Sequence, residues 1–297
     1  MHALDRRTPN ALAAMILALA CGLAGTAAAA PRTVSGDGGD RVGVLRARGE
    51  AYVKQGGLGA PWIRAAGDVK QIALAKDRVG VVTGDGVAYV KDGGLGAPWV
   101  RQADDVRGIA LAGDRIGVLK DNGEAYVKEG SLTAPWTLQA DRVKALELAA
   151  DRIGVIKGNG EAQVKQGSLT AGWVTQSADV VDLDLTDDRV GIVQRDGEAF
   201  VKKGSLDAGW VRQFTDTLQL ELSKDRIGVL RDTGEAYVKE GDLDAGWVRQ
   251  AANTLQIALS GDRVGIVRGD GQAQVKEGDL NAGWVHEADG VTELALS

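Results

Sequence analysis

Short apolar and β-branched runs alternate with polar turns from Asp40 onward, and no segment shows a useful helical period. A typical run is "DRIGVLK", Asp114 to Lys120, which ends at the turn "DNG" and is followed by a second run, "EAYVKE". Asn-Gly and Asp-Gly accept the positive φ angles of a two-residue hairpin, so they predict that the two runs pair antiparallel. A loop such as "GSLTAP" then leads to "WVRQ" and to a final alternating run, "IALA" or "LQLELS". The pattern predicts an all-β chain built from units of four short strands.

The unit repeats every 37 residues, seven times, without insertion or deletion. The phrase "DR[VI]G[VI]" begins at Asp40, Asp77, Asp114, Asp151, Asp188, Asp225 and Asp262. One tryptophan lies in register in each unit, at Trp62, Trp99, Trp136, Trp173, Trp210, Trp247 and Trp284. One lysine does the same, at Lys54, Lys91, Lys128, Lys165, Lys202, Lys239 and Lys276. A repeat this strict indicates one supersecondary unit used seven times.

Seven units of four antiparallel strands predict a seven-bladed β-propeller. The main rival is a β-solenoid, but its coils are generally shorter and do not end in Asp-Gly hairpins. The first unit starts at Asp40 without a preceding "IALA" strand, and "ELALS", Glu293 to Ser297, lies at the other end of the repeats. We therefore expect this last strand to complete the first blade and close the ring, whereas a solenoid would need distinct capping units.

The first thirty residues have the features of a secretory signal peptide. Arg6 and Arg7 precede the apolar run "ALAAMILALACGLAG", and small residues lead to a predicted cleavage site near Ala30. The apolar run is too short for a good membrane-spanning helix. Residues 31–39 are then a flexible leader and residues 40–297 the propeller. The expected location is secreted, either extracellular or periplasmic, with no membrane span.

Composition narrows the classes of function. Cys21 is the only cysteine and lies in the signal peptide, so the mature chain has no disulfides and must be closed by packing. Cleavage lowers the basic count from 35 to 33 and the acidic count from 41 to 40, which leaves a net charge of −7. A diffusely acidic surface argues against nucleic acid as a partner.

The residues needed for common catalytic sites are missing. His286 is the only histidine after the signal peptide, which excludes the usual triads and zinc clusters. No phosphate-binding loop or dinucleotide fingerprint occurs. Acidic residues recur in register rather than as one pair, at Glu50, Glu124, Glu161, Glu198 and Glu235. We therefore expect no enzyme, no catalytic residues, no metal and no cofactor.

The recurring tryptophan and lysine each have two interpretations. An indole once per blade is a good wedge between sheets, and an exposed indole face also stacks on a sugar ring. The lysine lies two residues after a variable planar position, which suggests a pocket that reads hydroxyls; the alternative is a snorkelling lysine whose stem covers the blade. That variable position holds Tyr52, Tyr89, Tyr126, Gln163, Phe200, Tyr237 and Gln274. Weaker candidates for polar contacts follow the tryptophans by three residues, at Gln102, Gln139, Gln176, Gln213 and Gln250.

The phrase "DRIGVL…GEAYVKEGSL.AGWV" resembles repeats of secreted bacterial proteins. Over residues 40–297 the plan is similar to the seven-bladed propeller lectins of bacteria and, more distantly, to the tachylectin and tectonin groups. The resemblance implies carbohydrate binding at or between blades. The expected protein is a monomeric, non-enzymatic lectin with several near-equivalent weak sites for glycans or glycoconjugates. The candidate contact residues are the seven tryptophans, the seven lysines and Tyr52, Tyr89, Tyr126 and Tyr237.

Two other hypotheses stay open. A scaffold propeller would bind a protein partner through one face of the ring, with one dominant site and no competition by saccharides. A weaker hypothesis is a hydrolase that uses carboxylates in the central channel.

Overall fold

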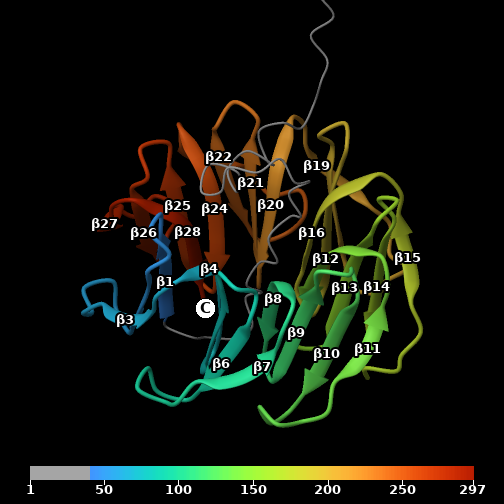
Figure 1. Ribbon diagram of the computed structural model, residues 1–297. Coiled ribbons are helices and arrows are strands. Elements are labelled where there is room, and N and C mark those ends of the chain that lie inside the picture. The colour runs from blue at the N-terminus through green and yellow to red at the C-terminus, as the bar shows by residue number, and fades with distance from the viewer. Residues whose placement is uncertain (1–40) are drawn as a thin grey trace, which may run out of the picture.

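The computed structural model describes residues 41–297, which form seven four-stranded antiparallel sheets around a central axis (Figure 1). Each sheet is one blade, and no helix occurs within this range. The predicted all-β, seven-bladed propeller is therefore confirmed. The predicted signal peptide with its cleavage near Ala30 and the leader of residues 31–39 lie outside the described residues.

Every blade uses the same four strand positions, counted outward from the axis. The innermost strands are β4 (Val69–Ala75), β8 (Val106–Ala112), β12 (Val143–Leu148), β16 (Val180–Leu185), β20 (Thr217–Ser223), β24 (Thr254–Ser260) and β28 (Val291–Leu296). The second strands are β1 (Arg41–Arg46), β5 (Arg78–Thr83), β9 (Arg115–Lys120), β13 (Arg152–Lys157), β17 (Arg189–Gln194), β21 (Arg226–Arg231) and β25 (Arg263–Arg268).

The outer half of each blade is equally regular. The third strands are β2 (Ala51–Gln55), β6 (Ala88–Asp92), β10 (Ala125–Glu129), β14 (Ala162–Gln166), β18 (Ala199–Lys203), β22 (Ala236–Glu240) and β26 (Ala273–Glu277). The outermost strands are β3 (Ile63–Ala66), β7 (Val100–Ala103), β11 (Thr137–Ala140), β15 (Val174–Ser177), β19 (Val211–Phe214), β23 (Val248–Ala251) and β27 (Val285–Ala288). We number the blades 1 to 7 along the chain, so that blade 1 contains β1–β3 and blade 7 contains β24–β27.

The ring is closed by β28, which pairs antiparallel with β1 as the innermost strand of blade 1. Val42 lies opposite Leu296 and Val44 opposite Leu294. Beyond these pairs, the Arg41 amide donates to the Ser297 carbonyl at 3.2 Å. The predicted closure by the last strand is confirmed, and blade 1 thereby reaches the same four strands as the others.

Turns and linkers form one continuous backbone network on one side of the ring. The glycine of each second-to-third-strand hairpin has a φ between 76° and 87°, as the Asp-Gly and Asn-Gly dipeptides predict. The Val69 amide donates to the Gly49 carbonyl in blade 1, and the Gly84 amide of blade 2 donates to the Asp68 carbonyl. The linker at residues 68–69 therefore joins the hairpins of two adjacent blades.

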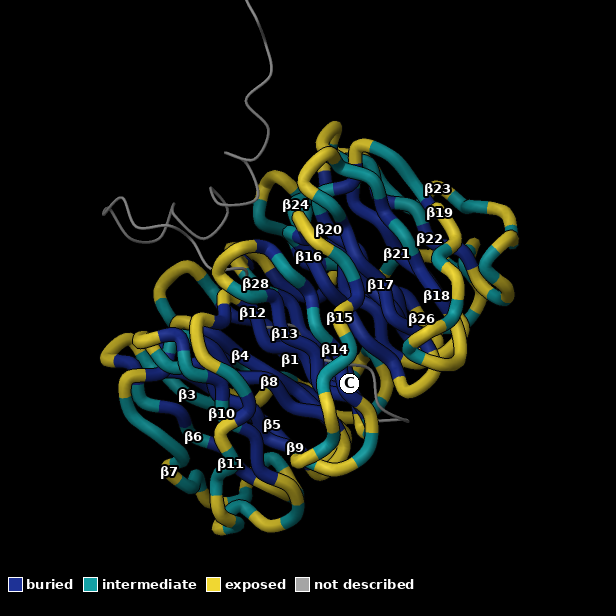
Figure 2. Tube along the Cα trace, turned by 90° about the vertical axis from the view of Figure 1, so that its right-hand side faces the viewer, coloured by how far each residue is buried: buried dark blue, intermediate teal, exposed yellow. Residues whose placement is uncertain are grey.

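The buried core follows the strands, whereas exposure is concentrated in the loops (Figure 2). Adjacent blades approach most closely at the glycine of the "DRIG" phrase. A Cβ atom on Gly117 would lie 2.8 Å from the Leu146 Cδ2 atom of blade 4, and one on Gly191 would lie 2.3 Å from the Leu220 Cδ2 atom of blade 6. This glycine therefore recurs because the innermost strand of the next blade packs directly onto it.

Candidate functional site between adjacent blades

Each tryptophan lies just before an outermost strand and packs against the preceding blade. Trp99 of blade 2 contacts a core cluster that includes Ala51 and Val53 of blade 1, and Trp136 of blade 3 contacts the corresponding cluster of blade 2. The Trp99 indole N–H donates to the Ala65 carbonyl across the interface at 3.3 Å. All seven indoles are half-buried. The wedge interpretation is confirmed, and part of each side chain stays accessible to a ligand.

The repeated lysine lies beneath the tryptophan of its own blade. All seven lysines are only 1–4% exposed, so they do not snorkel to solvent. Each ammonium donates to the carbonyl of a leucine four residues later, as Lys128 does to Leu132. Each also lies over the indole of its own blade, 4.6–5.0 Å from the ring centroid. The ammonium groups thus support the indoles from behind and reach no open surface in this conformation.

Burial also lowers the pKa of six of these lysines. Desolvation lowers the pKa of Lys91, Lys128, Lys165, Lys202, Lys239 and Lys276 from the usual lysine value. The leucine carbonyl and the negative face of the indole replace part of the lost hydration. The lysine and the tryptophan of each blade therefore form one contacting pair.

The arginine of each "DR" phrase is buried and joins neighbouring blades. Its guanidinium donates to the carbonyl of a loop glycine in the next blade, as Arg115 does to Gly167. Several also pair with a carboxylate on their own third strand, such as Arg226 with Glu240 at 2.8 Å. Each arginine therefore links two blades through a hydrogen bond, whereas its ion pair, where present, stays within its own blade.

The glutamines three residues after the tryptophans face the interface rather than open solvent. Gln139, Gln176 and Gln213 are buried, and Gln102 and Gln250 are half-buried. Each Nε2 atom donates to the carbonyl two residues earlier at 3.0–3.2 Å, as Gln139 does to Thr137. Within the described residues the five Oε1 atoms have no hydrogen-bond partner. These amides therefore line the interface without forming an exposed polar contact surface.

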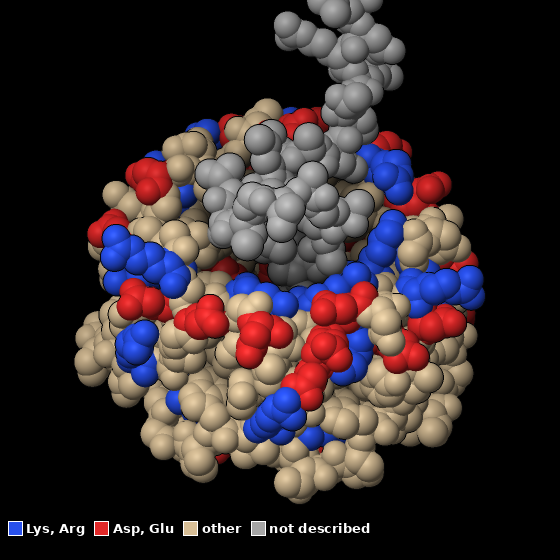
Figure 3. Space-filling view, viewed as in Figure 1, with Lys and Arg blue, Asp and Glu red and all other residues tan. Residues whose placement is uncertain are grey.

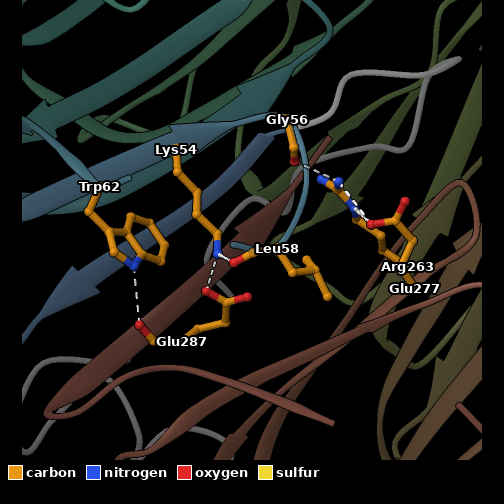
Figure 4. Close-up of polar contacts among 7 residues, drawn as sticks. All are labelled: Lys54, Gly56, Leu58, Trp62, Arg263, Glu277 and Glu287. Atoms are coloured by element: carbon orange, nitrogen blue, oxygen red, sulfur yellow. Dashed lines mark hydrogen bonds and ion pairs between the residues drawn. The ribbon is translucent and has the colours of Figure 1, made fainter. Parts of the chain in front are cut away.

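The interface between blades 7 and 1 is different (Figure 4). Glu287 takes the place of the glutamine, and its carboxylate forms an ion pair with Lys54; the two side chains are 2% and 1% exposed. The Trp62 indole N–H donates to the Glu287 carbonyl at 3.2 Å. Desolvation raises the pKa of Glu287, although Lys54 favours its charged form. A glutamate in place of the glutamine that five other interfaces carry thus creates a buried charge pair.

The four predicted tyrosines lie on the third strands, on the blade face that carries the tryptophans. Tyr52, Tyr89, Tyr126 and Tyr237 are half-buried, and their strand partners are Arg64, Arg101, Leu138 and Arg249. The Tyr126 hydroxyl donates to the Glu124 carboxylate at 2.9 Å. Tyr52, Tyr89 and Tyr126 pack on the core of the preceding blade together with the tryptophan, and Tyr237 and Trp247 both contact Phe214 of the preceding blade. The structure therefore brings these two candidate residues to the same interface.

Sequence reasoning missed a set of polar side chains near the axis that join the innermost strands of adjacent blades. The side chain of Gln71 both donates to the Ile109 carbonyl and accepts from the Ile109 amide of the next blade. Gln256 does the same with Leu294. In this register Glu293 accepts from the Ile72 amide at 3.3 Å, and burial raises its pKa to about 8. The sequence does contain polar residues within the otherwise apolar innermost strands, and these residues could have indicated such contacts.

On the face seen in Figure 3, the charges of the described residues do not form a patch of one sign that would indicate a charged ligand. Basic and acidic side chains are intermingled around its middle. Residues 41–297 contain no cluster of three histidine or carboxylate side chains arranged to hold a metal ion. Within the same range, no helix has the length and apolar character that crossing a membrane requires.

Comparisons with known proteins identify the fold only. No family model matches the sequence, and no curated protein matches it. Among solved structures, Prp20p from Saccharomyces cerevisiae superposes with a TM-score of 0.62 at 11% identity, covering 75% of this chain and 79% of that one. PorZ, a surface component of the type-IX secretion system of Porphyromonas gingivalis, gives a TM-score of 0.61 at 15% identity over 87% of this chain. The chain spans only 38% of the length of PorZ.

A further match is yeast RCC1 (Prp20) bound to Kap60, with a TM-score of 0.56 at 11% identity over 68% of each chain. Prp20p itself has been characterised for binding to Gsp1p and histones. At these identities the likeness shows a β-propeller and nothing about ligands. The chain is thus a seven-bladed β-propeller of 37-residue repeats.

Proposed function

We propose that the chain is a secreted, non-enzymatic carbohydrate-binding propeller with several weak sites between its blades. The observation that supports this most directly is the half-buried indole at each of the seven interfaces, held by a buried lysine. An indole fixed in this way offers an apolar face to a sugar ring without losing conformational entropy on binding. Several such sites on one rigid ring gain avidity on a surface dense with glycans.

Each candidate residue has a defined part in this proposal. The tryptophans and the tyrosines form the contact surface, because both are partly exposed. The lysines hold the indoles from behind, because they are buried. Binding of this kind requires no chemical step, cofactor or metal. Secretion rests on the predicted signal peptide at residues 1–30.

A broad glycan array tests the proposal, followed by avidity measurements on a glycan-coated surface. Trp210→Phe keeps an aromatic wedge but reduces the stacking face, so we expect a partial, few-fold loss of avidity while the protein remains folded. An array without any signal, or a folded variant with unchanged avidity, contradicts the proposal.

The second candidate is a protein-binding propeller. The outermost strands expose apolar side chains, with Leu138 52% and Ile63 46% exposed, and such side chains contribute to protein interfaces. The fold likeness to propellers that bind proteins, such as RCC1 with Kap60, is compatible with this candidate. It predicts one dominant site that saccharides do not compete for, which the same array and a competition assay distinguish.

A further inference from the structure

The last residue of each outermost strand points toward the next blade, and six of the seven are small. These six are Ala66, Ala103, Ala140, Ser177, Ala251 and Ala288. The seventh is Phe214, in blade 5. In the same register, Ala66 packs against the same core cluster as Tyr89 and Trp99 of blade 2, and Ala103 against the same cluster as Tyr126 and Trp136 of blade 3. The position therefore belongs to the interface that holds the two aromatic candidates of the following blade.

The Phe214 ring fills this place at the interface between blades 5 and 6. Its centroid lies 5.2 Å from that of Tyr237, with the planes tilted by 36°, and 5.0 Å from that of Trp247 in an edge-to-face arrangement at 81°. Phe214 is half-buried. No other pair of aromatic rings within residues 41–297 is in contact, so elsewhere the tryptophan and the third-strand residue stand apart.

We propose that the Phe214 ring occupies, from within the chain, a place that other blades offer to a six-membered ring of a ligand. We call this place the notch, and define it by the tryptophan, the third-strand residue two positions before the lysine, and the small residue of the preceding blade. The occupant is a pyranose ring of a glycan. This inference rests on the proposed carbohydrate-binding function and assigns its sites.

The surroundings of the notch favour a pyranose over a purely apolar ring. A pyranose has the size of a phenyl ring and an apolar face that stacks on an aromatic side chain. Its hydroxyls need polar partners, and the notches carry them at the edge. The Tyr126 hydroxyl and the Glu124 carboxylate lie at one notch, and Arg212 pairs with Glu198 at another. A mostly apolar site with a few placed polar groups is typical of small-ligand recognition.

The seven notches are not equivalent. Phe214 closes the notch of Tyr237 and Trp247. The notches of blades 4 and 7 have Gln163 and Gln274 in place of the aromatic wall. At Tyr52 the Arg46 guanidinium covers the ring, 4.8 Å from its centroid. The notches with a free aromatic wall are those of Tyr89, Tyr126 and Phe200, so we expect three stronger sites rather than seven.

The seven indoles give one reporter per notch. In protein labelled with ¹⁵N-tryptophan, each indole N–H gives one resonance, assigned by Trp→Phe variants. The probes are glucose, galactose, mannose and N-acetylglucosamine, with phenol as an aromatic probe. In the wild type we expect one or more sugars to shift the resonances of Trp99, Trp136 and Trp210 but not that of Trp247.

One substitution should open a closed notch, a second should fill an open one, and a third is the matched control. Phe214→Ala should make Trp247 a fourth responding indole. Ala103→Phe should abolish the response of Trp136 alone. Ala140→Phe makes the same change at the notch walled by Gln163 and should leave the set of responding indoles unchanged.

Each other result overturns the inference. If sugars shift indole resonances but Phe214→Ala and Ala103→Phe do not change which indoles respond, the notch is not the binding site. Carbohydrate binding itself would still be supported. If the array is positive and no indole responds, the sugar sites lie elsewhere. If only phenol follows the substitutions, the notch takes an aromatic ring and the pyranose assignment is wrong. If the array and all indoles are silent, the carbohydrate-binding proposal fails as well.

Discussion

The interface between blades 7 and 1 and the interface between blades 2 and 3 have the same backbone but different charge. Lys128 of blade 3 faces a blade that carries Gln102, whereas Lys54 of blade 1 pairs with the buried carboxylate of Glu287. Near the axis, Glu293 of β28 stands where Gln71 and Gln256 stand in other blades. The elements that close the ring therefore carry Glu287 at a position that is glutamine in five other blades, and Glu293 at a position that is glutamine in three other blades and Asp182 in blade 5.

The comparison shows that the same backbone position accepts either a neutral amide or a buried carboxylate. An amide needs no counter-charge, so the interface of blades 2 and 3 remains uncharged on that side. A buried carboxylate loses several kcal/mol of hydration, which the ion pair only partly restores. The raised pKa of Glu287 and the pKa of about 8 for Glu293 have this common cause. Closure of the ring should therefore depend on pH through these two carboxyl groups.

The largest difference is expected from removing the lysine at each interface. Lys128→Met removes one hydrogen bond and one cation–π contact, which we expect to lower the free energy of unfolding by about 1–2 kcal/mol. Lys54→Met also leaves the Glu287 charge buried and unpaired, so we expect a loss of about 3–5 kcal/mol. Urea denaturation at pH 7 measures both. Equal losses would show that the ion pair of Glu287 has no special role.

The control for this experiment removes the carboxylate of Glu287 instead of leaving it without Lys54. Glu287→Gln recreates the lysine and glutamine of five other interfaces, and Lys54→Met with Glu287→Met replaces the pair by apolar groups of similar volume. Because replacing both partners of a buried pair is often neutral or stabilising, we expect the double variant to recover most of the loss. We expect Glu287→Gln to be tolerated as well, since Lys128 is accommodated opposite Gln102. Failure of the double variant to recover stability would mean that packing of the lysine stem, not the buried charge, explains the loss.

The next largest effect should come from Glu293 and should change with pH. Its folded-state pKa of about 8 lies above that of an unfolded glutamate. The stability that depends on its neutral form is therefore complete below about pH 4 and is lost as the pH rises through the folded value. Glu293→Gln cannot ionise, and its amide can bind Ile72 as Gln256 binds Leu294.

We expect Glu293→Gln to match the wild type near pH 4 and to exceed its free energy of unfolding by roughly 2–3 kcal/mol at pH 7. Thermal unfolding across this range measures the difference. Gln256→Glu is the reciprocal variant and should introduce the same pH dependence into blade 7. A Glu293→Gln variant whose advantage does not grow with pH would contradict the assignment of a neutral folded carboxyl.

The architecture was predictable because it follows from local patterns that repeat. The 37-residue period, the Asn-Gly and Asp-Gly hairpins and the displaced last strand specify blade number, strand pairing and closure without any long-range information. The recurring tryptophan indicated the interface for the same reason, since one large apolar residue per unit must be buried against a neighbour.

The details of the site were not predictable from the repeat. The sequence places Lys128 eight residues before Trp136, but only the folded loop shows that the indole covers the ammonium. Phe214 and Glu287 are single departures from the repeat, and their meaning depends on which residues of the next blade they meet. Side-chain exposure and contacts across an interface are tertiary properties, which periodicity alone does not contain.

The smallest expected effect comes from an ion pair whose carboxylate is exposed, which tests whether burial or charge pairing distinguishes the closing interface. Arg226 pairs with Glu240, whose side chain is 45% exposed, whereas the strand partner of Arg189 is Lys203. Within the described residues the Nε and Nη1 atoms of Arg189 have no hydrogen-bond partner. Lys203→Glu supplies a carboxylate opposite Arg189. The ion pair it removes, between Lys203 and Asp242 at 3.8 Å, is exposed.

We expect Lys203→Glu to raise the free energy of unfolding by about 0.5–1 kcal/mol, since an exposed carboxylate keeps most of its hydration. Glu240→Lys is the matched control and should lower it by a similar amount, with both effects reduced at high salt. Urea denaturation at low and high ionic strength measures them. A gain as large as the loss from Lys54→Met would show that charge pairing alone, and not the burial of Glu287, distinguishes the closing interface from the others.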